Sequence, residues 1–249
     1  MAFDVAADAY GRFMGRYSEP LADQLVSLAG VRRGMRALDV GCGPGVLTSR
    51  LADRLGADRV AALDPSPPFV AAARERCPGV DIRQGTAEEL PFADGTFDVA
   101  LANLVVHFMS DPVGGLREMG RVGGEVAATV WNHATATGPL STFWGAVKDI
   151  DPDAADEATL PGTREGALGA LARAAGLRDV AEGTLTVTVP YSSFDEWWEP
   201  YTLGVGPAGD YVKKLDPDAR AALRAHCAEL LPDGPFSIDA TAWTVLARA

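Results

Sequence analysis

Three glycines at alternate positions form the stretch of this sequence that points most directly to chemistry. The segment LDVGCGPG places Gly41, Gly43 and Gly45 after an apolar run and before a helical pattern. In nucleotide-binding α/β folds, a strand, a glycine-rich turn and a helix form the first crossover, where the backbone approaches a ligand at the helix N-terminus. Dinucleotide-binding turns use GxGxxG around a pyrophosphate, whereas GxGxG suits a smaller ligand without phosphate.

A carboxylate follows at the end of the next apolar run. Asp64 comes directly after the predicted strand at 59–63. A carboxylate accepts several hydrogen bonds at once, which suits the two hydroxyls of a ribose. Ser66 and Pro67 are typical of a helix N-cap and first helical residue, so Asp64 is not needed to begin that helix.

The elements that must position these residues alternate between strand and helix patterns, which indicates a parallel α/β sheet. We predict strands at 36–40, 59–63, 80–83, 97–102, 125–130, 183–189 and 237–248. We predict helices at 20–28, from Pro44 through Leu55, and at 67–76, 111–122 and 164–175.

Length, charge and cysteine content restrict the class of protein. A chain of 249 residues with 47% hydrophobic composition can bury one large core, so we expect a single domain over 1–249. The formal charge of −12 repels nucleic acid and anionic lipid. Three widely spaced cysteines predict neither a metal site nor disulfides. We therefore expect a soluble, cytoplasmic protein with no nucleic-acid or membrane partner.

The glycine turn and Asp64 resemble the first two motifs of class I S-adenosylmethionine-dependent methyltransferases. GTAEELPF at 85–92 resembles the family loop that brackets adenine, and FDVALANLVVHF at 97–108 resembles the segment beside the transferred methyl. LREMGRV at 116–122 resembles a family helix, and the set covers 36–131 in the family order. The leader AYGRFMGRYSEPLA resembles the ubiquinone/menaquinone-biosynthesis-like branch, in which the N-terminal segment folds over the cofactor.

This resemblance implies a Rossmann-like, seven-stranded, mostly parallel sheet with helices on both faces. It also implies S-adenosylmethionine as cofactor and S-adenosylhomocysteine as product. The cofactor contacts that it implies are Tyr10, Phe13, Arg16, Asp39, Gly41, Cys42, Gly43, Gly45, Asp64, Pro65, Thr86, Ala87, Glu88, Asn103 and Leu104.

Two positions depart from the family pattern. Thr86 stands where the family usually has Asp, so we expect Glu88 and the main chain around Ala87 to contact the adenine edge. The segment RVGGE at 121–125 is shorter than the usual family turn, which predicts a trimmed connection before the fifth strand with the fold intact.

The segments outside the predicted core carry most of the aromatic residues. We expect 1–35 to form an N-terminal cap, 36–131 the cofactor-binding core, and 132–164 and 192–235 insertions that form a lid over the acceptor. A hydrophobic core contact is the alternative for the aromatic side chains. The lid hypothesis predicts a small, apolar or aromatic acceptor contacted by Trp131, Phe143, Trp144, Trp197, Trp198 and Tyr201.

Methyl transfer is an in-line displacement at a carbon that a positive sulfur already activates, so positioning accounts for much of the catalysis. A general base is needed only for a hydroxyl or a protonated amine. His107 is the first candidate base and His133 the second, with a packing role beside the cofactor as the alternative for His107.

Other functions use the same cofactor or a similar turn. An enzyme could bind S-adenosylmethionine and catalyse a cyclisation or rearrangement, or the protein could bind the cofactor without catalysis. A nicotinamide-dependent dehydrogenase is disfavoured by the glycine spacing and by the absence of a clear catalytic Tyr and Lys pair. The sequence leaves the acceptor and the oligomeric state undetermined.

Overall fold

A computed structural model describes residues 7–249, so residues 1–6 of the predicted cap lie outside the described part of the chain. Seven strands form one sheet in the order β3-β2-β1-β4-β5-β7-β6. The strands are β1 (Ala37–Val40), β2 (Val60–Asp64), β3 (Asp81–Gln84), β4 (Phe97–Asn103), β5 (Gly123–Trp131), β6 (Arg178–Tyr191) and β7 (Phe236–Arg248). Neighbours among β1 to β5 are parallel, and β7 is antiparallel to both β5 and β6. The predicted Rossmann-like, mostly parallel sheet is confirmed.

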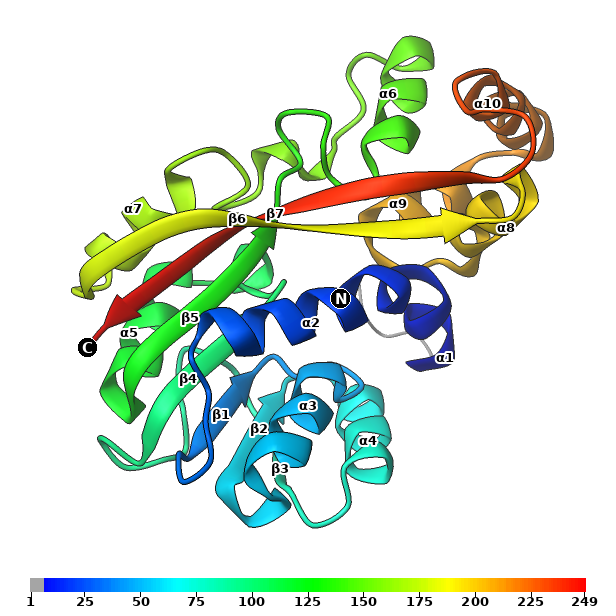
Figure 1. The fold of residues 1–249 in the computed structure, drawn as a ribbon. Coiled ribbons are helices and arrows are strands. Elements are labelled where there is room, and N and C mark those ends of the chain that lie inside the picture. Colours follow the sequence, from blue (N-terminus) through cyan, green and yellow to red (C-terminus); the bar gives the residue numbers. More distant parts are fainter. Residues whose placement is uncertain (1–6) are drawn as a thin grey trace.

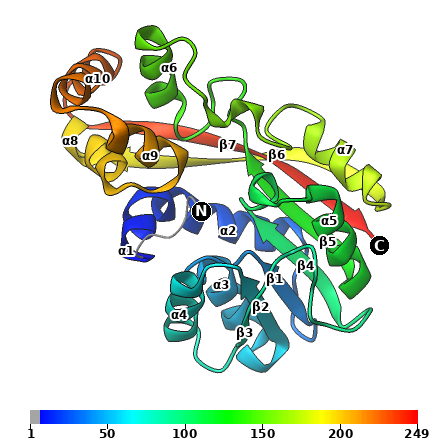
Figure 2. The ribbon, with the colours of Figure 1, turned by 180° about the vertical axis from the view of Figure 1, so that it is seen from behind.

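Helices cover both faces of this sheet (Figures 1 and 2). The helices are α1 (Ala7–Tyr10), α2 (Arg16–Leu28), α3 (Val46–Leu55), α4 (Pro67–Arg76), α5 (Pro112–Val122), α6 (Ser141–Ile150), α7 (Ala167–Ala174), α8 (Phe194–Trp198), α9 (Gly206–Lys214) and α10 (Pro217–Glu229). A π-helical turn, Gly11–Gly15, joins α1 to α2. Helices α2, α3 and α4 lie on one face and α5 and α7 on the other.

Side-chain alternation along the central strands supplies both cores. In β1, Leu38 and Val40 pack with α5 residues, whereas Ala37 packs with α2 and α3. In β4, Val99 and Leu101 face α3, and the intervening alanines face α5. Because both faces are buried, these strands read as continuous apolar runs in the sequence.

The strands β6 and β7 extend beyond the rest of the sheet and carry a second layer of helices (Figure 1). Residues 242–248 of β7 lie between β5 and β6 and pair with both strands. Residues 236–241 pair with β6 and extend past the end of β5. Helices α6, α8, α9 and α10 gather around this extension together with the start of α2. We refer to these helices and the π-helical turn as the cap. The insertions predicted at 132–164 and 192–235 supply its helices.

Several predicted boundaries shift for identifiable reasons. Helix α3 begins at Val46 and not at Pro44, because Gly45 has a left-handed φ of +84°. Strand β6 begins at Arg178, before the predicted 183–189, because the antiparallel strand β7 continues to Arg248, which pairs with Arg178. Helix α5 passes directly into β5 at Gly123, where a Cβ would lie 3.0 Å from the backbone nitrogen of Ala100. The predicted trimmed turn is therefore confirmed.

Within residues 7–249, none of the helices has both the length and the apolar character that crossing a membrane requires.

Candidate functional site

A cavity of about 840 Å³ opens at the carboxyl ends of the central strands, between the sheet and the cap. Its wall includes residues that follow β1, β2, β4 and β5, and residues from the π-helical turn and the start of α9. Open α/β sheets bind ligands at this edge. Sites for small molecules enclose roughly 300–1,000 Å³, and the volume of this cavity lies within that range.

The glycine turn forms the floor of the cavity. The φ angles of Gly41 and Gly43 are +72° and +52°, and both residues line the cavity. A Cβ at Gly41 would lie 2.5 Å from both γ-carbons of Val105, whereas a Cβ at Gly43 would enter open space. Gly45 does not line the cavity but faces α4, where a Cβ at this position would lie 3.2 Å from the Cα of Ala73. The predicted cofactor contact of Gly45 is therefore replaced by a packing role.

Cys42 also lines the cavity. Burial raises the pKa of its thiol well above the ordinary value, and the nearby Asp39 adds to this effect. The side chain is therefore a neutral, apolar filler of the turn.

Asp64 is held beneath the turn by the backbone. Its Oδ2 accepts a hydrogen bond from the Gly43 amide at 2.9 Å, and its Oδ1 accepts one from the Ser66 amide at 2.8 Å. Burial raises the pKa of the carboxyl, and these two backbone bonds counteract the effect. A carboxylate has about four acceptor positions, so both oxygens retain capacity for ligand hydroxyls.

Asp39 is more deeply buried, with 1% of its surface exposed. Its Oδ2 accepts a hydrogen bond from Thr48 at 2.6 Å, and its buried Oδ1 has no hydrogen-bond partner within residues 7–249. Burial raises its pKa to about 7. Because buried polar atoms are nearly always paired, Oδ1 marks a position where a ligand can donate a hydrogen bond.

Two histidines lie on the cavity wall with their ring centroids 6.2 Å apart. His107 follows β4 and His133 follows β5. Burial lowers the pKa of both: that of His107 falls well below the ordinary value, and that of His133 falls to about 4. The Nδ1 of His107 and the Nε2 of His133 have no hydrogen-bond partner among the described residues. Both imidazoles are therefore neutral, weak bases with an unpaired nitrogen.

The backbone at the end of β4 is strained where it meets the cavity. Leu104 has a φ of +63°, which is unfavourable for a residue with a Cβ. Its amide donates to the carbonyl and the hydroxyl of Thr129, and the Oδ1 of Asn103 accepts from the same hydroxyl at 2.8 Å. These bonds hold Asn103 and Leu104 against the cavity, where the sequence predicted them.

Pro65, directly after β2, and Thr86, Ala87 and Glu88, in the loop after β3, lie on the same wall. The Oε1 of Glu88 already accepts hydrogen bonds from the amides of Ser110 and Asp111 at 2.8 and 3.2 Å. Glu88 thus ties two loops together, and its contact with adenine stays a prediction.

The N-terminal segment contributes Tyr10 and Phe13 to the cavity but not Arg16. Arg16 instead forms an ion pair with Glu196 at 2.9 Å, donates to the carbonyl of Pro190 at 2.6 Å, and lies 4.3 Å from the ring centroid of Tyr191. The predicted cofactor contact of Arg16 is therefore corrected, because its partners lie on β6 and α8.

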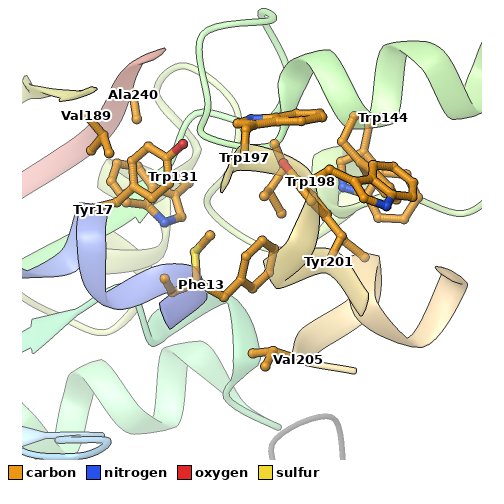
Figure 3. Close-up of a cluster of buried hydrophobic side chains, with 14 of the residues drawn as sticks. Phe13, Tyr17, Trp131, Trp144, Val189, Trp197, Trp198, Tyr201, Val205 and Ala240 are labelled. Atoms are coloured by element: carbon orange, nitrogen blue, oxygen red, sulfur yellow. The ribbon is translucent and has the colours of Figure 1, made fainter. Parts of the chain in front are cut away.

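Most of the aromatic residues predicted to touch the acceptor form the core of the cap. Phe143 and Tyr201 stack at 4.5 Å, and Phe13 meets Tyr201 edge-on at 4.9 Å. Figure 3 shows Trp197, Trp198 and Tyr201 in one cluster with Trp144 and Phe13, which come from other elements. Of the six predicted acceptor contacts, Trp131 lines the cavity, and the five that do not are Phe143, Trp144, Trp197, Trp198 and Tyr201. Their predicted direct contact is corrected to packing within the cap.

Other cavity residues were not found by sequence reasoning. Glu157 lies in the connection between α6 and α7, and residues 205–208 lie at the start of α9. Met14 and Ser18 join Tyr10 and Phe13 from the N-terminal segment. Helical spacing in the leader offered a signal for Met14 and Ser18, but no motif or periodicity marks Glu157.

Comparisons with known proteins find similar sequences and folds among methyltransferases. Residues 38–127 match the model of a family described as a methyltransferase domain. Trans-aconitate 2-methyltransferase from Mycobacterium tuberculosis is 39% identical over 104 residues, which are 42% of this chain and 38% of that protein. Malonyl-[acyl-carrier protein] O-methyltransferase from Erwinia billingiae is 34% identical over 146 residues, 57% of each chain. The matched segments thus span less than two thirds of these curated relatives.

Among solved structures, phosphoethanolamine N-methyltransferase 2 from Haemonchus contortus, in complex with S-adenosylhomocysteine, superimposes with a TM-score of 0.61 at 16% identity. The match covers 99% of this chain and 57% of that one. This likeness confirms the fold.

Proposed function

We propose that this protein is a methyltransferase that transfers a methyl group from S-adenosylmethionine to a small-molecule acceptor. The observation that carries the proposal is the single cavity that joins the glycine turn and Asp64 to an end enclosed by the cap. The methyltransferase-domain match over 38–127 supports the cofactor, because it covers the turn, Asp64 and the loop after β3.

The residues of the turn fit S-adenosylmethionine. The backbone of Gly41 and Gly43 would pass beneath the methionine portion, and Asp64 would accept hydrogen bonds from the ribose hydroxyls. The unpaired Oδ1 of Asp39 offers an acceptor for an ammonium group. When bound, the cofactor supplies a methyl group activated by a positively charged sulfur. The buried carboxyls of Asp39 and Asp64 favour a cationic ligand at this place.

The remaining residues position the acceptor and exclude water. The buried cap encloses the cavity from the side opposite the turn, and Trp131 with Phe13 forms apolar wall. His107 and His133 can accept a hydrogen bond from an acceptor hydroxyl or amine, but the lowered pKa values make them weak proton acceptors. Catalysis would therefore depend chiefly on alignment, with His107 before His133 as the candidate base.

The acceptor atom is O, N or C in this proposal. The relatives are named for different acceptors, trans-aconitate and malonyl-[acyl-carrier protein], and the structural neighbour is an N-methyltransferase. The leader's resemblance to the ubiquinone/menaquinone-biosynthesis-like branch favours a small molecule. Two competing functions predict no release of S-adenosylhomocysteine. An enzyme that catalyses another reaction with the same cofactor would convert its substrate without releasing this product. A protein without catalytic activity would only bind the cofactor.

Calorimetric titration with S-adenosylmethionine and with S-adenosylhomocysteine tests the cofactor assignment. We expect micromolar binding of both, and a loss of about 1–3 kcal/mol in the Asp64→Ala variant through lost charge-assisted hydrogen bonds. Asp53→Ala, at an exposed position of α3, is the matched control. Unchanged affinity in the Asp64→Ala variant would contradict the assignment, and product release with a panel of acceptors then tests methyl transfer.

A further inference from the structure

The distribution of charge in the cavity is one-sided. Its lining includes four acidic residues, Asp39, Asp64, Glu88 and Glu157. Among the described residues that line it, there is no lysine or arginine. Asp39, Asp64 and Glu88 lie beside the glycine turn or the loop after β3, where the cofactor is expected. Glu157 belongs to the opposite, cap side.

Glu157 is an uncompensated buried carboxyl. Only 5% of its surface is exposed, and among residues 7–249 its carboxyl has one hydrogen bond, which Oε2 accepts from the indole nitrogen of Trp144 at 2.8 Å. Two basic side chains of the surrounding segments have other partners: Lys148 pairs with Asp156, and Arg164 donates to the carbonyl of Ala158 at 3.4 Å. Burial raises the pKa of Glu157 to about 7, and the indole bond and Asp156 are secondary influences.

A buried carboxylate is costly unless a cation or several donors compensate it. The described part of the chain supplies a single neutral donor, the Trp144 indole, so a ligand that brings positive charge gains most by binding beside Glu157. An acceptor that carries a carboxylate would instead place a second anion in a cavity whose described lining has no basic side chain.

The neighbouring wall is compatible with a cation. His107 and His133 are neutral, so they offer polar atoms without repelling an ammonium group. Phe13 and Trp131 add aromatic surface, which attracts cations when they lie over a ring face.

We propose that Glu157 binds a protonated amino group of the acceptor, so that the substrates are apolar molecules with a basic nitrogen and carboxylic acids are rejected. This inference rests on the proposed function. It specifies how the acceptor is recognised and leaves open which of its atoms receives the methyl group.

Matched ligands that differ only in one polar group test the proposal. On phenyl, indole and cyclohexyl scaffolds, the ethylamine, the ethanol and the acetate of each ring are titrated calorimetrically into protein saturated with S-adenosylhomocysteine. We expect at least one amine to bind about tenfold or more tighter than its matched acid, which is about 1.4 kcal/mol. Glu157→Gln should abolish this preference, while Glu165→Gln, at an exposed position, should preserve it.

The outcomes separate this inference from the proposed function. If S-adenosylhomocysteine itself does not bind, the cofactor assignment fails. If it binds but no amine does, or acids bind as tightly as amines, or Glu157→Gln keeps the preference, the recognition by Glu157 is overturned. Glutamine retains an oxygen for the Trp144 indole, and a melting curve checks its fold. Should that variant not fold, the comparison of amines with acids on the unaltered protein decides.

Discussion

Two glycines of the same turn should respond differently to alanine. Gly41 and Gly43 both have positive φ, +72° and +52°, so alanine at either position costs about 1–2 kcal/mol of left-handed strain. The space around them differs. A Cβ at Gly41 lies 2.5 Å from both γ-carbons of Val105, whereas a Cβ at Gly43 has no neighbour within 4 Å and points into open space beside the cavity.

The expected magnitudes follow from this difference. Gly41→Ala combines strain with overpacking against Val105, which typically adds about 1–3 kcal/mol, so the free energy of unfolding should fall by about 2–5 kcal/mol. Gly43→Ala should lower it by only about 1–2 kcal/mol. Its methyl group should nevertheless reduce affinity for S-adenosylmethionine by at least about tenfold, or 1.4 kcal/mol, because it occupies space on the cavity floor.

Urea denaturation measures the first quantity and calorimetry the second. Val105→Ala in the Gly41→Ala background removes both γ-carbons and should recover most of the overpacking penalty but none of the strain. The reasoning would be refuted if Gly43→Ala bound the cofactor with unchanged affinity, or if Val105→Ala failed to recover stability in the double variant.

Two further changes test the positions of individual side chains. Arg16→Gln should lower the free energy of unfolding by about 1 kcal/mol, because the ion pair with Glu196 and the contact with Tyr191 are lost. The affinity for the cofactor should stay unchanged. A weakened affinity would show that Arg16 does contact the cofactor. The pKa of His133 is lowered to about 4 by burial, so the unfolded chain takes up a proton first as the pH falls below about 6.5. His133 therefore lowers the free energy of unfolding as the pH falls from about 6.5 to 4. Urea titrations across this range should show a smaller decrease in that free energy for His133→Gln than for the unaltered protein.

The central sheet and the cofactor side of the cavity could be predicted from the sequence because their determinants are local. Gly41 and Gly43 follow their strand directly, and Asp64 ends the next one, so the order of parallel strands brings them to the same edge. The apolar runs of β1, β2 and β4 indicate burial on both faces without reference to any distant residue.

The cap could not be predicted in the same way because its contacts join residues far apart in the chain. Arg16 resembles a leader residue that covers the cofactor, but Pro190 and Glu196 draw it to β6 and α8. The aromatic residues of the two insertions satisfy helical spacing equally well as a lid or as a core, and only their mutual stacking shows the core.

The sequence by itself determined the sheet, the glycine turn and the carboxylate beside it, since periodicity and turn chemistry act over a few neighbouring residues. Only the tertiary structure decided which side chains face the acceptor end of the cavity. Glu157 became a candidate binding residue because folding buries it beside Trp144 with a single hydrogen bond. Burial and the loss of solvent depend on packing between distant segments, which no local pattern records.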